Sequence, residues 1–347
     1  YPIPKEEGGT EVHLIWCDNP CRTTCWNDGN LSVEAFRSPK IETIIVQHPW
    51  LENDTVLADL ILPVSTKFEQ DDYGIDRDCQ YSCVYFEDKC IEPVGEAKSD
   101  YDIVCEVARK LGLYEEYTQG KTVQEWIRVA HDNAMAPSLV TWDELKEKGY
   151  FPLPTAPDWQ DDPAGMIGFA EDPEGHPVKT PSGKLEFYSE RLATHFPEDT
   201  ERPPVPHWIE KTDLLDERLS SERTKAFPLL MMSNHPRWRH HAQGDDISWT
   251  REIPTCKVEG VDGYLYEPLW IHPSDAAKRG IEAGDIVKAF NERGIVLCGA
   301  HVTERVMPGV VYVDHGSRVD WIIPGEVDRG GAINLICPAA TTSKNCV

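Results

Sequence analysis

The first sixty residues alternate short apolar runs with polar turns, and this pattern predicts strand–helix–strand structure. Strands are expected at 12–16, 41–47 and 59–62, with a helix between the first two at about 31–37. The strands are continuous apolar runs, which are typical of a parallel sheet covered on both faces. The pattern therefore predicts an α/β domain built on a parallel sheet.

Polar turns follow the first two of these strands. One turn carries Asn19 and Pro20, and the other carries Gln47 and His48. Ligands of open parallel sheets bind outside the carboxyl ends of the strands, so we interpret these four residues as candidate cofactor-binding residues. The spacing leaves open the alternative that they are plain loop residues. The chain has no G-x-G-x-x-G run, which disfavours an ordinary NAD site.

An amphipathic helix is predicted next, after the capping residue Ser99 and before Gly112. Asp100 opens this helix and is most simply a cap or a first-turn carboxylate. A second helix is expected near 123–132. These helices complete the predicted α/β part of the chain.

The amino-acid composition and the apolar pattern change after the helices. Residues 135–220 are dense in proline and acidic residues and predict an extended connector, with one strand at 184–188. Residues 221–347 show short strands and tight turns, including a hairpin that joins 284–290 to 294–298. Short strands with tight turns and one small helix predict a closed β-barrel.

Net charge separates the same regions. The chain carries a formal charge of −26, of which −24 falls in residues 1–220 and −2 in residues 221–347. This balance argues against a nucleic-acid-binding surface, and no apolar run reaches membrane-spanning length. The charge step also indicates a domain boundary near residue 220.

Eleven cysteines form no regular disulfide framework, so we expect reduced thiols in a cytoplasmic or anaerobic setting. Cys17, Cys21 and Cys25 are spaced by three residues, which fits neither a zinc knuckle nor the common iron–sulfur runs. We therefore assign no metal ligand. The chain does not begin with methionine and is expected to be a segment of a longer protein.

The run 233–243 holds two arginines and three histidines and follows the apolar run 228–232, which predicts a buried strand. Guanidinium groups bind phosphate bidentately, and imidazoles add further donors. The run therefore predicts an anion-binding loop. The alternative is a solvated basic patch.

Five motifs in order resemble the dimethyl sulfoxide reductase (molybdopterin oxidoreductase) family. They are Ala58–Pro63 with Glu69, Thr180–Phe187, Pro236–Gln243, Glu267–Ala277 with Gly284-Asp285, and Gly331–Leu335. The resemblance implies a partial Rossmann-like α/β domain (1–134), a connector (135–220) and a six-stranded double-psi β-barrel that binds molybdopterin dinucleotide (221–347). The segment would be the carboxyl-terminal part of such an enzyme.

Further runs resemble the large subunits of pyrogallol–phloroglucinol transhydroxylases and of catechol dehydroxylases. These runs are 89–96, 99–101, 141–144, 148–151, 258–264 and 328–331. The resemblance implies an oxidoreductase that transfers hydroxyl between phenols, with a small phenolic substrate. Reductive removal of hydroxyl, a molybdenum reductase of N- or S-oxides, and a non-catalytic binding module are the alternatives.

The resemblance also implies a cofactor, partners and residue roles. The cofactor would be bis-molybdopterin guanine dinucleotide with molybdenum or tungsten, and iron–sulfur clusters would lie on a small partner subunit. Asn19 and Gln47 match positions that face guanosine or its diphosphate, and Asp100 matches an acceptor for a guanine edge. Arg237, His241 and Gln243 match the cofactor-facing loop of the barrel. Asn334 matches a pterin contact.

Two positions depart from the family pattern. Asp18 stands where many members have glycine, and Ala242 stands where they have serine. The metal ligand and the catalytic residues of the family lie upstream, in the remainder of the large subunit, so no catalytic residue is assigned. His240, Tyr312 and His315 are interpreted as structural or supporting residues.

Overall fold

The computed structural model describes most of the chain between residues 5 and 339. The residues left out of this range are 52, 77–81, 135, 156, 159, 162–164, 200–202, 208–215, 217, 219, 246 and 254–255. The described chain divides into one compact unit made of residues up to 151 together with 228–339, and a second unit within 152–227. The domain boundaries at 134 and 220 stay a prediction.

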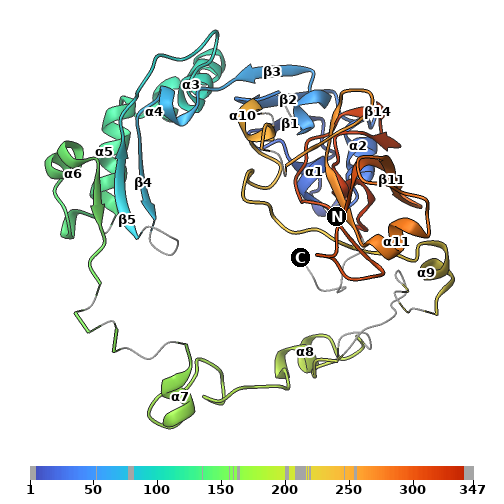
Figure 1. Cartoon of the computed structure of the whole chain (residues 1–347). Coiled ribbons are helices and arrows are strands. Elements are labelled where there is room, and N and C mark those ends of the chain that lie inside the picture. The colour runs from blue at the N-terminus through green and yellow to red at the C-terminus, as the bar shows by residue number, and fades with distance from the viewer. Residues whose placement is uncertain are drawn as a thin grey trace. The chain divides into compact units, whose positions relative to one another are not determined.

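The first unit begins with a parallel sheet of three strands in the order β1-β2-β3 (Figure 1). The strands are β1 (Leu14–Cys17), β2 (Thr43–His48) and β3 (Leu60–Pro63), and both pairings are parallel. Two helices, α1 (Arg22–Cys25) and α2 (Gly29–Phe36), lie between β1 and β2 in sequence. The predicted parallel strands and the helix between them are confirmed, whereas the Rossmann-like assignment stays a prediction.

Helices and an antiparallel sheet follow. The helix predicted after Ser99 is α3 (Asp100–Leu111): the Ser99 side chain accepts a hydrogen bond from Asp102 N, and Gly112 ends the helix at φ 73°. The remaining elements are α4 (Tyr114–Thr118), α5 (Val123–Asn133), α6 (Trp142–Lys148), β4 (Asp72–Asp76), β5 (Cys83–Glu87) and β6 (Tyr150–Pro152). The three strands pair in the order β4-β5-β6.

A mixed seven-stranded sheet dominates the carboxyl-terminal part of the unit. Its path is β14-β15-β12-β10-β13-β7, and β11 pairs with β12. The strands are β7 (Leu230–Met232), β10 (Pro268–Ile271), β11 (Ile286–Asn291), β12 (Gly294–Val302), β13 (Val310–Tyr312), β14 (Trp321–Ile323) and β15 (Val327–Asp328). The predicted hairpin is confirmed as β11–β12. The pairings along this path do not join β14 to β7, so the closed six-stranded barrel stays a prediction.

Smaller elements complete the fold. In the first unit these are the β8–β9 pair (Val258–Glu259 with Leu265–Tyr266), α10 (Ser248–Arg251), α11 (Pro273–Ala277) and the 3₁₀ turns η1 (Lys5–Glu7), η2 (Asn53–Leu57), η3 (Lys67–Glu69), η4 (Ala136–Ser138) and η5 (Ile333–Ile336). The second unit contains α7 (Ile167–Glu171), α8 (Glu190–His195) and α9 (Glu222–Ala226).

Two predicted strands need correction. The strand before the arginine–histidine run is β7, but it is not buried, because it lies at the edge of the sheet and only Met231 packs on the core. Leu230 and Met232 point away and are 64% and 48% exposed. The strand predicted at 184–188 does not form. The segment is irregular and Phe187 is 75% exposed, because no strand in the described part of the chain pairs with it and covers its apolar side chains.

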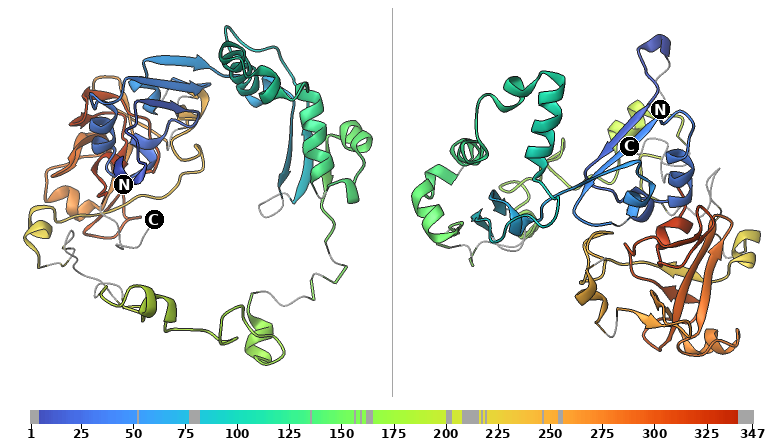
Figure 2. Two further views of the ribbon diagram at one scale, coloured as in Figure 1. Left: turned by 180° about the vertical axis from the view of Figure 1, so that it is seen from behind. Right: turned by 90° about the horizontal axis from the view of Figure 1, so that it is seen from above.

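Turn η5 packs between the parallel sheet β1-β2-β3 with its helices and the mixed seven-stranded sheet, both in the first unit. Leu335, in η5, is 1% exposed and belongs to the core of the mixed sheet. Its side chain also reaches helix α2, because a Cβ added to Gly29 would lie 2.7 Å from Leu335 Cδ2. The blue amino-terminal elements and the red carboxyl-terminal elements accordingly lie side by side in every view (Figure 2).

We predict that Leu335→Ala lowers the free energy of unfolding by about 2–5 kcal/mol, since it removes buried atoms from a core shared by both sheet systems. Urea denaturation followed by circular dichroism measures the change. The matched control is Leu230→Ala, at the exposed edge position, for which we expect less than about 1 kcal/mol. Equal effects of the two substitutions would contradict the packing described for η5.

Candidate functional site

The two polar turns after β1 and β2 lie at the same edge of the parallel sheet. Neighbouring parallel strands bring their carboxyl ends together, and Cys17 at the end of β1 pairs with Val46 near the end of β2. Asn19 is exposed in the first turn, whereas Pro20 beside it is buried. The predicted placement of these turns at one edge is therefore observed.

Gln47 connects this edge to the start of helix α3. Trp16 Nε1 donates to Gln47 Oε1 over 3.1 Å, and Gln47 Nε2 donates to Asp100 Oδ1 over 2.5 Å. Gln47 is 4% exposed and His48 beside it is 7% exposed, but Asp100 is open to solvent. Within the described part of the chain, the second carboxylate oxygen of Asp100 has no partner. The hydrogen bond from Gln47 thus orients the Asp100 carboxylate as a hydrogen-bond acceptor at the edge of the sheet.

The loop after β7 contacts the turn after β1. The side chain of Gln243 donates to Asn19 Oδ1, which joins two of the predicted cofactor-binding residues. Buried Asn53 donates from Nδ2 to the carbonyl of Ala242 over 2.5 Å. Ala242, which stands where the family pattern has serine, is fully buried. The two loops thus form one polar surface although they are far apart in sequence.

The two arginines of the run have different environments. Arg239 is buried: its guanidinium contacts Asp245 at 3.0 Å and Glu267 at 2.8 Å. Arg237 is exposed and pairs with no side chain among the residues that the structure describes. Two buried carboxylates therefore neutralise Arg239, which was not among the predicted cofactor-binding residues. Arg237 alone is available to an anion.

Lys257 completes this buried charge network. Its ammonium lies 2.6 Å from Glu267 and 3.3 Å from Asp245, so two cations face two anions. Burial opposes ionisation, but the charges of Lys257 and Arg239 outweigh it and lower the pKa of Asp245 to about 2. The sequence did not reveal this network, because its members lie in different loops.

Histidine rings from two loops meet beside this network. His235 packs against His241 and His315, with ring centroids 4.5 and 4.6 Å apart. His241 Nδ1 lies 3.4 Å from His315 Nε2. Burial, and then the neighbouring His235, lower the pKa of His241, so neutral imidazoles are favoured here. His241 also adopts φ 51°, which is uncommon for a residue with a side chain.

Asn334 links these histidines to helix α1. Its Nδ2 donates to the carbonyl of Cys25 over 3.0 Å, and His315 Nδ1 lies 3.2 Å from its Oδ1. Cys25, His241 and His315 consequently hold their ligand atoms within 4.8 Å of one another. A hydrogen bond from the Cys21 thiol lowers the pKa of Cys25. Cysteine spacing alone did not indicate this cluster, because its histidines come from distant loops.

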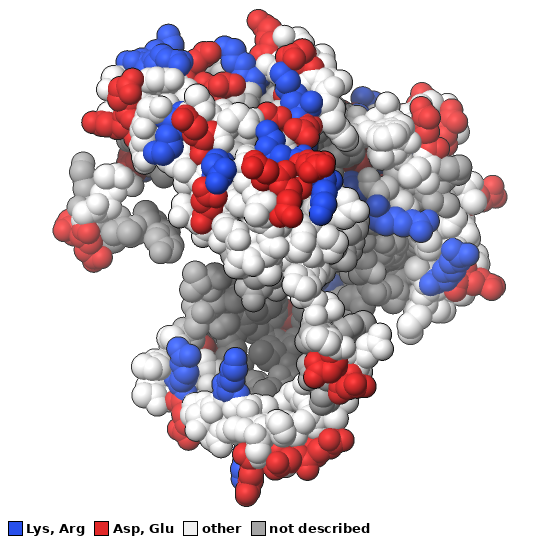
Figure 3. Space-filling model, turned by 90° about the vertical axis from the view of Figure 1, so that its left-hand side faces the viewer, with Lys and Arg blue, Asp and Glu red and all other residues white. Residues whose placement is uncertain are grey.

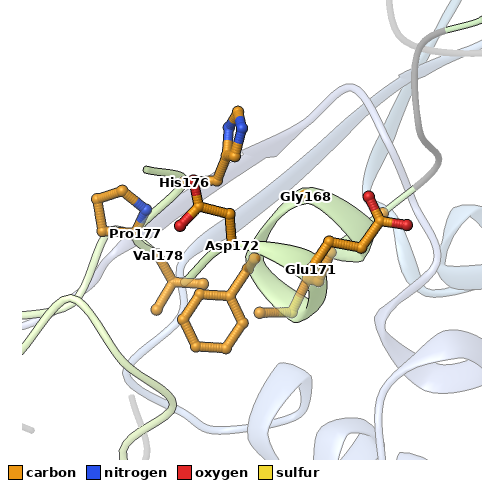
Figure 4. A pocket seen from close by; sticks show the side chains of 9 residues that line it. Gly168, Glu171, Asp172, His176, Pro177 and Val178 are labelled. Atoms are coloured by element: carbon orange, nitrogen blue, oxygen red, sulfur yellow. The ribbon is translucent and has the colours of Figure 1, made fainter. Parts of the chain in front are cut away.

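A hollow in the second unit contains none of the predicted residues (Figure 4). It lies beside α7 and has a volume of about 430 Å³. Its lining consists of residues 165, 166, 168, 169, 171, 172 and 176–178. Its Asp172 accepts from the backbone N–H of Gly175 and acts as a turn residue. We assign no chemistry to this hollow.

On the face drawn in Figure 3, acidic and basic side chains are interspersed, and the described residues there form no continuous basic area. In the described part of the chain, no helix has both the length and the apolar character needed to cross a membrane.

Comparison with known proteins identifies two family models. Residues 5–110 match the model "Molybdopterin oxidoreductase", and residues 229–346 match "Molydopterin dinucleotide binding domain". The large subunit of pyrogallol hydroxytransferase from Pelobacter acidigallici is 31% identical over 99% of this chain and 42% of its own length. Dimethyl sulfoxide reductase DmsA from Escherichia coli is 34% identical over 96% of this chain and 40% of its own length.

A solved structure shows the same fold. Acetylene hydratase from Pelobacter acetylenicus aligns with 93% of this chain and 40% of its own length, at a TM-score of 0.62 and 18% identity. The chain thus spans about two fifths of the length of the proteins it matches.

We predict that Glu267→Gln lowers the free energy of unfolding by about 3–5 kcal/mol, because it leaves Arg239 and Lys257 with one buried counter-charge between them. Urea denaturation at neutral pH measures the loss. Glu259→Gln, at an exposed position in β8, is the matched control and should change stability by less than about 0.5 kcal/mol. A loss below about 1 kcal/mol for Glu267→Gln would mean that solvent reaches the network.

Proposed function

We propose that this chain, which belongs to the molybdopterin oxidoreductase family, is the carboxyl-terminal part of a molybdenum or tungsten enzyme and helps to hold bis-molybdopterin guanine dinucleotide. The observation that carries the proposal is the meeting of the β1 turn with the loop after β7, through the contact of Asn19 with Gln243. Both loops lie within segments matched by the two family models.

The donors and acceptors at this surface fit such a cofactor. A dinucleotide presents a pyrophosphate, which needs cationic donors, and a guanine, which needs a carboxylate or amide partner. Arg237 supplies an exposed guanidinium that pairs with no side chain in the described part of the chain, and Asp100 supplies a carboxylate oriented by Gln47. The bound metal–pterin group supplies two-electron redox and oxygen-transfer chemistry, and the protein binds and orients it.

Each predicted residue has a role in this proposal. Arg237 binds the pyrophosphate, and Asp100 accepts hydrogen bonds from the guanine edge while Gln47 holds it. Asn19 and Gln243 exchange their mutual hydrogen bond for bonds to the cofactor. His241 and Asn334 face the pterin, whereas buried Pro20 and His48 shape the two turns.

The substrate class in our proposal is a polyhydroxylated aromatic ring, on which the enzyme transfers hydroxyl between phenols. Support comes from the similarity to pyrogallol hydroxytransferase, which extends over 99% of this chain. A second candidate is the reduction of S- or N-oxides, because dimethyl sulfoxide reductase DmsA is similar at 34% identity. Reductive dehydroxylation of catechols is a further variant of the first candidate. An iron–sulfur partner subunit and a cytoplasmic location belong to the same proposal.

The test uses the full-length polypeptide that contains this chain, purified without oxygen. Pterin fluorescence after acid release and molybdenum or tungsten analysis should show two pterins for each metal atom. Turnover of pyrogallol, and none of dimethyl sulfoxide or trimethylamine N-oxide, would support phenol chemistry, whereas the reverse would establish the reductase. A purified protein without pterin would refute the cofactor assignment.

We predict that Arg237→Ala reduces cofactor affinity about tenfold to a hundredfold, because one charge-assisted contact contributes about 1.5–3 kcal/mol. Pterin content per chain measures the loss, while the urea midpoint should stay unchanged since Arg237 is exposed. Arg305→Ala, another exposed arginine of the mixed-sheet region, is the control and should keep full pterin content. Full occupancy in Arg237→Ala would show that this arginine is only a surface residue.

A further inference from the structure

We propose that Cys25, His241 and His315 bind a zinc-type transition-metal ion in addition to the molybdenum or tungsten of the cofactor, with His241 binding this ion through Nδ1, which leaves its Nε2 for the pterin contact proposed above. Their ligand atoms lie within 4.8 Å of one another. The proposal goes beyond the function argued above and does not require that the pterin cofactor be present.

The spacing of the two imidazoles fits a tetrahedral ion. Zinc binds histidine nitrogen at about 2.0–2.1 Å, so two nitrogens on one tetrahedral ion lie about 3.3–3.4 Å apart. His241 Nδ1 and His315 Nε2 are 3.4 Å apart. This separation matches that of two imidazole ligands on one zinc ion, and the ligand atom of Cys25 lies within 4.8 Å of those of both histidines.

The hydrogen bonds of Asn334 fix the ring of His315 in the form that binds a metal. Asn334 Nδ2 donates to the carbonyl of Cys25, so its Oδ1 is left to accept from His315 Nδ1. The lone pair of His315 is then on Nε2, the atom that faces His241. Metal-binding histidines typically donate their other ring N–H to such an acceptor.

The same contacts hold the three ligands in place before an ion binds. Asn334 ties the backbone of Cys25 to the ring of His315 although the residues come from different segments. The loop that carries His241 presses on Gly316, where an added Cβ would lie 1.7 Å from the carbonyl oxygen of His241. His241 itself is held at φ 51°, and backbone strain of this kind is concentrated at functional sites.

The ligand set selects the class of ion. One thiolate and two imidazoles favour zinc and similar borderline ions over calcium or magnesium, which prefer oxygen. Three protein ligands leave the fourth tetrahedral position for water or for the neighbouring Cys21 thiol, which hydrogen-bonds Cys25. The competing explanation is a simple hydrogen bond between the two imidazoles, with no ion.

The experiment titrates the full-length protein with Co²⁺ after removal of loosely bound metal, with pterin measured on the same sample. We expect one Co²⁺ per chain and a thiolate-to-cobalt charge-transfer band, and Zn²⁺ should displace the ion and abolish the band. Cys25→Ser should remove the band. His241→Gln should weaken Co²⁺ binding at least tenfold without loss of fold, because His241 is exposed.

The control is His240→Gln, because this exposed ring packs edge-on against His241, with ring centroids 4.9 Å apart, but is outside the cluster. It should keep full Co²⁺ affinity. Asn334→Ala should weaken binding about tenfold to a hundredfold through the lost orientation of His315. No thiolate band in the unaltered protein, or equal Co²⁺ affinity in His241→Gln and His240→Gln, would overturn the proposal. Bound Co²⁺ in a protein without pterin would support this site while refuting the cofactor assignment.

Discussion

Buried asparagine side chains fix the two halves of the candidate site relative to each other. Asn53 is fully buried, accepts from Thr24 Oγ1 and donates to the carbonyl of Ala242, 189 positions away in sequence. Asn334 donates to the carbonyl of Cys25, 309 positions away. Each bond adds only about 0.5–1.5 kcal/mol, but loss of the donor would leave a buried carbonyl unsatisfied at a cost of about 1–3 kcal/mol. The register of the two loops is therefore strongly determined.

This constraint explains why the site depends on the whole first unit. The β1 turn is placed by the parallel sheet, and the loop after β7 is placed by the mixed sheet. Turn η5 packs against both systems through Leu335 and also carries Asn334, so the apolar core and the polar connection share one short segment. A shift of η5 would move a core residue and a site residue together.

Local signals in the sequence predicted the elements well. The three parallel strands, the capped helix α3 and the β11–β12 hairpin follow from apolar runs, a serine cap and turn residues, which act over a few neighbouring positions. The burial of β7 was wrong, because apolar composition cannot distinguish an edge strand from a central one. The prediction of a strand at 184–188 was wrong for a related reason. A strand forms only beside a pairing strand, and the apolar pattern of one segment does not indicate whether such a partner exists.

The site was predictable only in part, since its contacts are long-range. Strand ends placed Asn19 and Gln47 at one edge of the sheet, but nothing local indicated which of two neighbouring arginines would be buried. Arg239 is neutralised by Glu267, 28 positions on, and the spacing of Cys25 gives no sign of His315. Motif resemblance identified Arg237 and Gln243, whereas the cluster of Cys25, His241 and His315 became apparent only from the fold.

The buried charge network bears on our proposal that this strongly acidic chain presents an anion-binding loop. Arg239 and Lys257 balance Asp245 and Glu267, so these four charges cancel and exert little net field on the loop above them. The exposed charge of Arg237 is then the one that an approaching anion meets from this run. Because the region 221–347 is nearly neutral overall while the rest of the chain carries −24, the proposed anionic cofactor would meet less repulsion at this loop than in the acidic part of the chain. The buried, neutralised Arg239 thus holds the loop in place, and the exposed Arg237 gives the loop a positive charge at its surface.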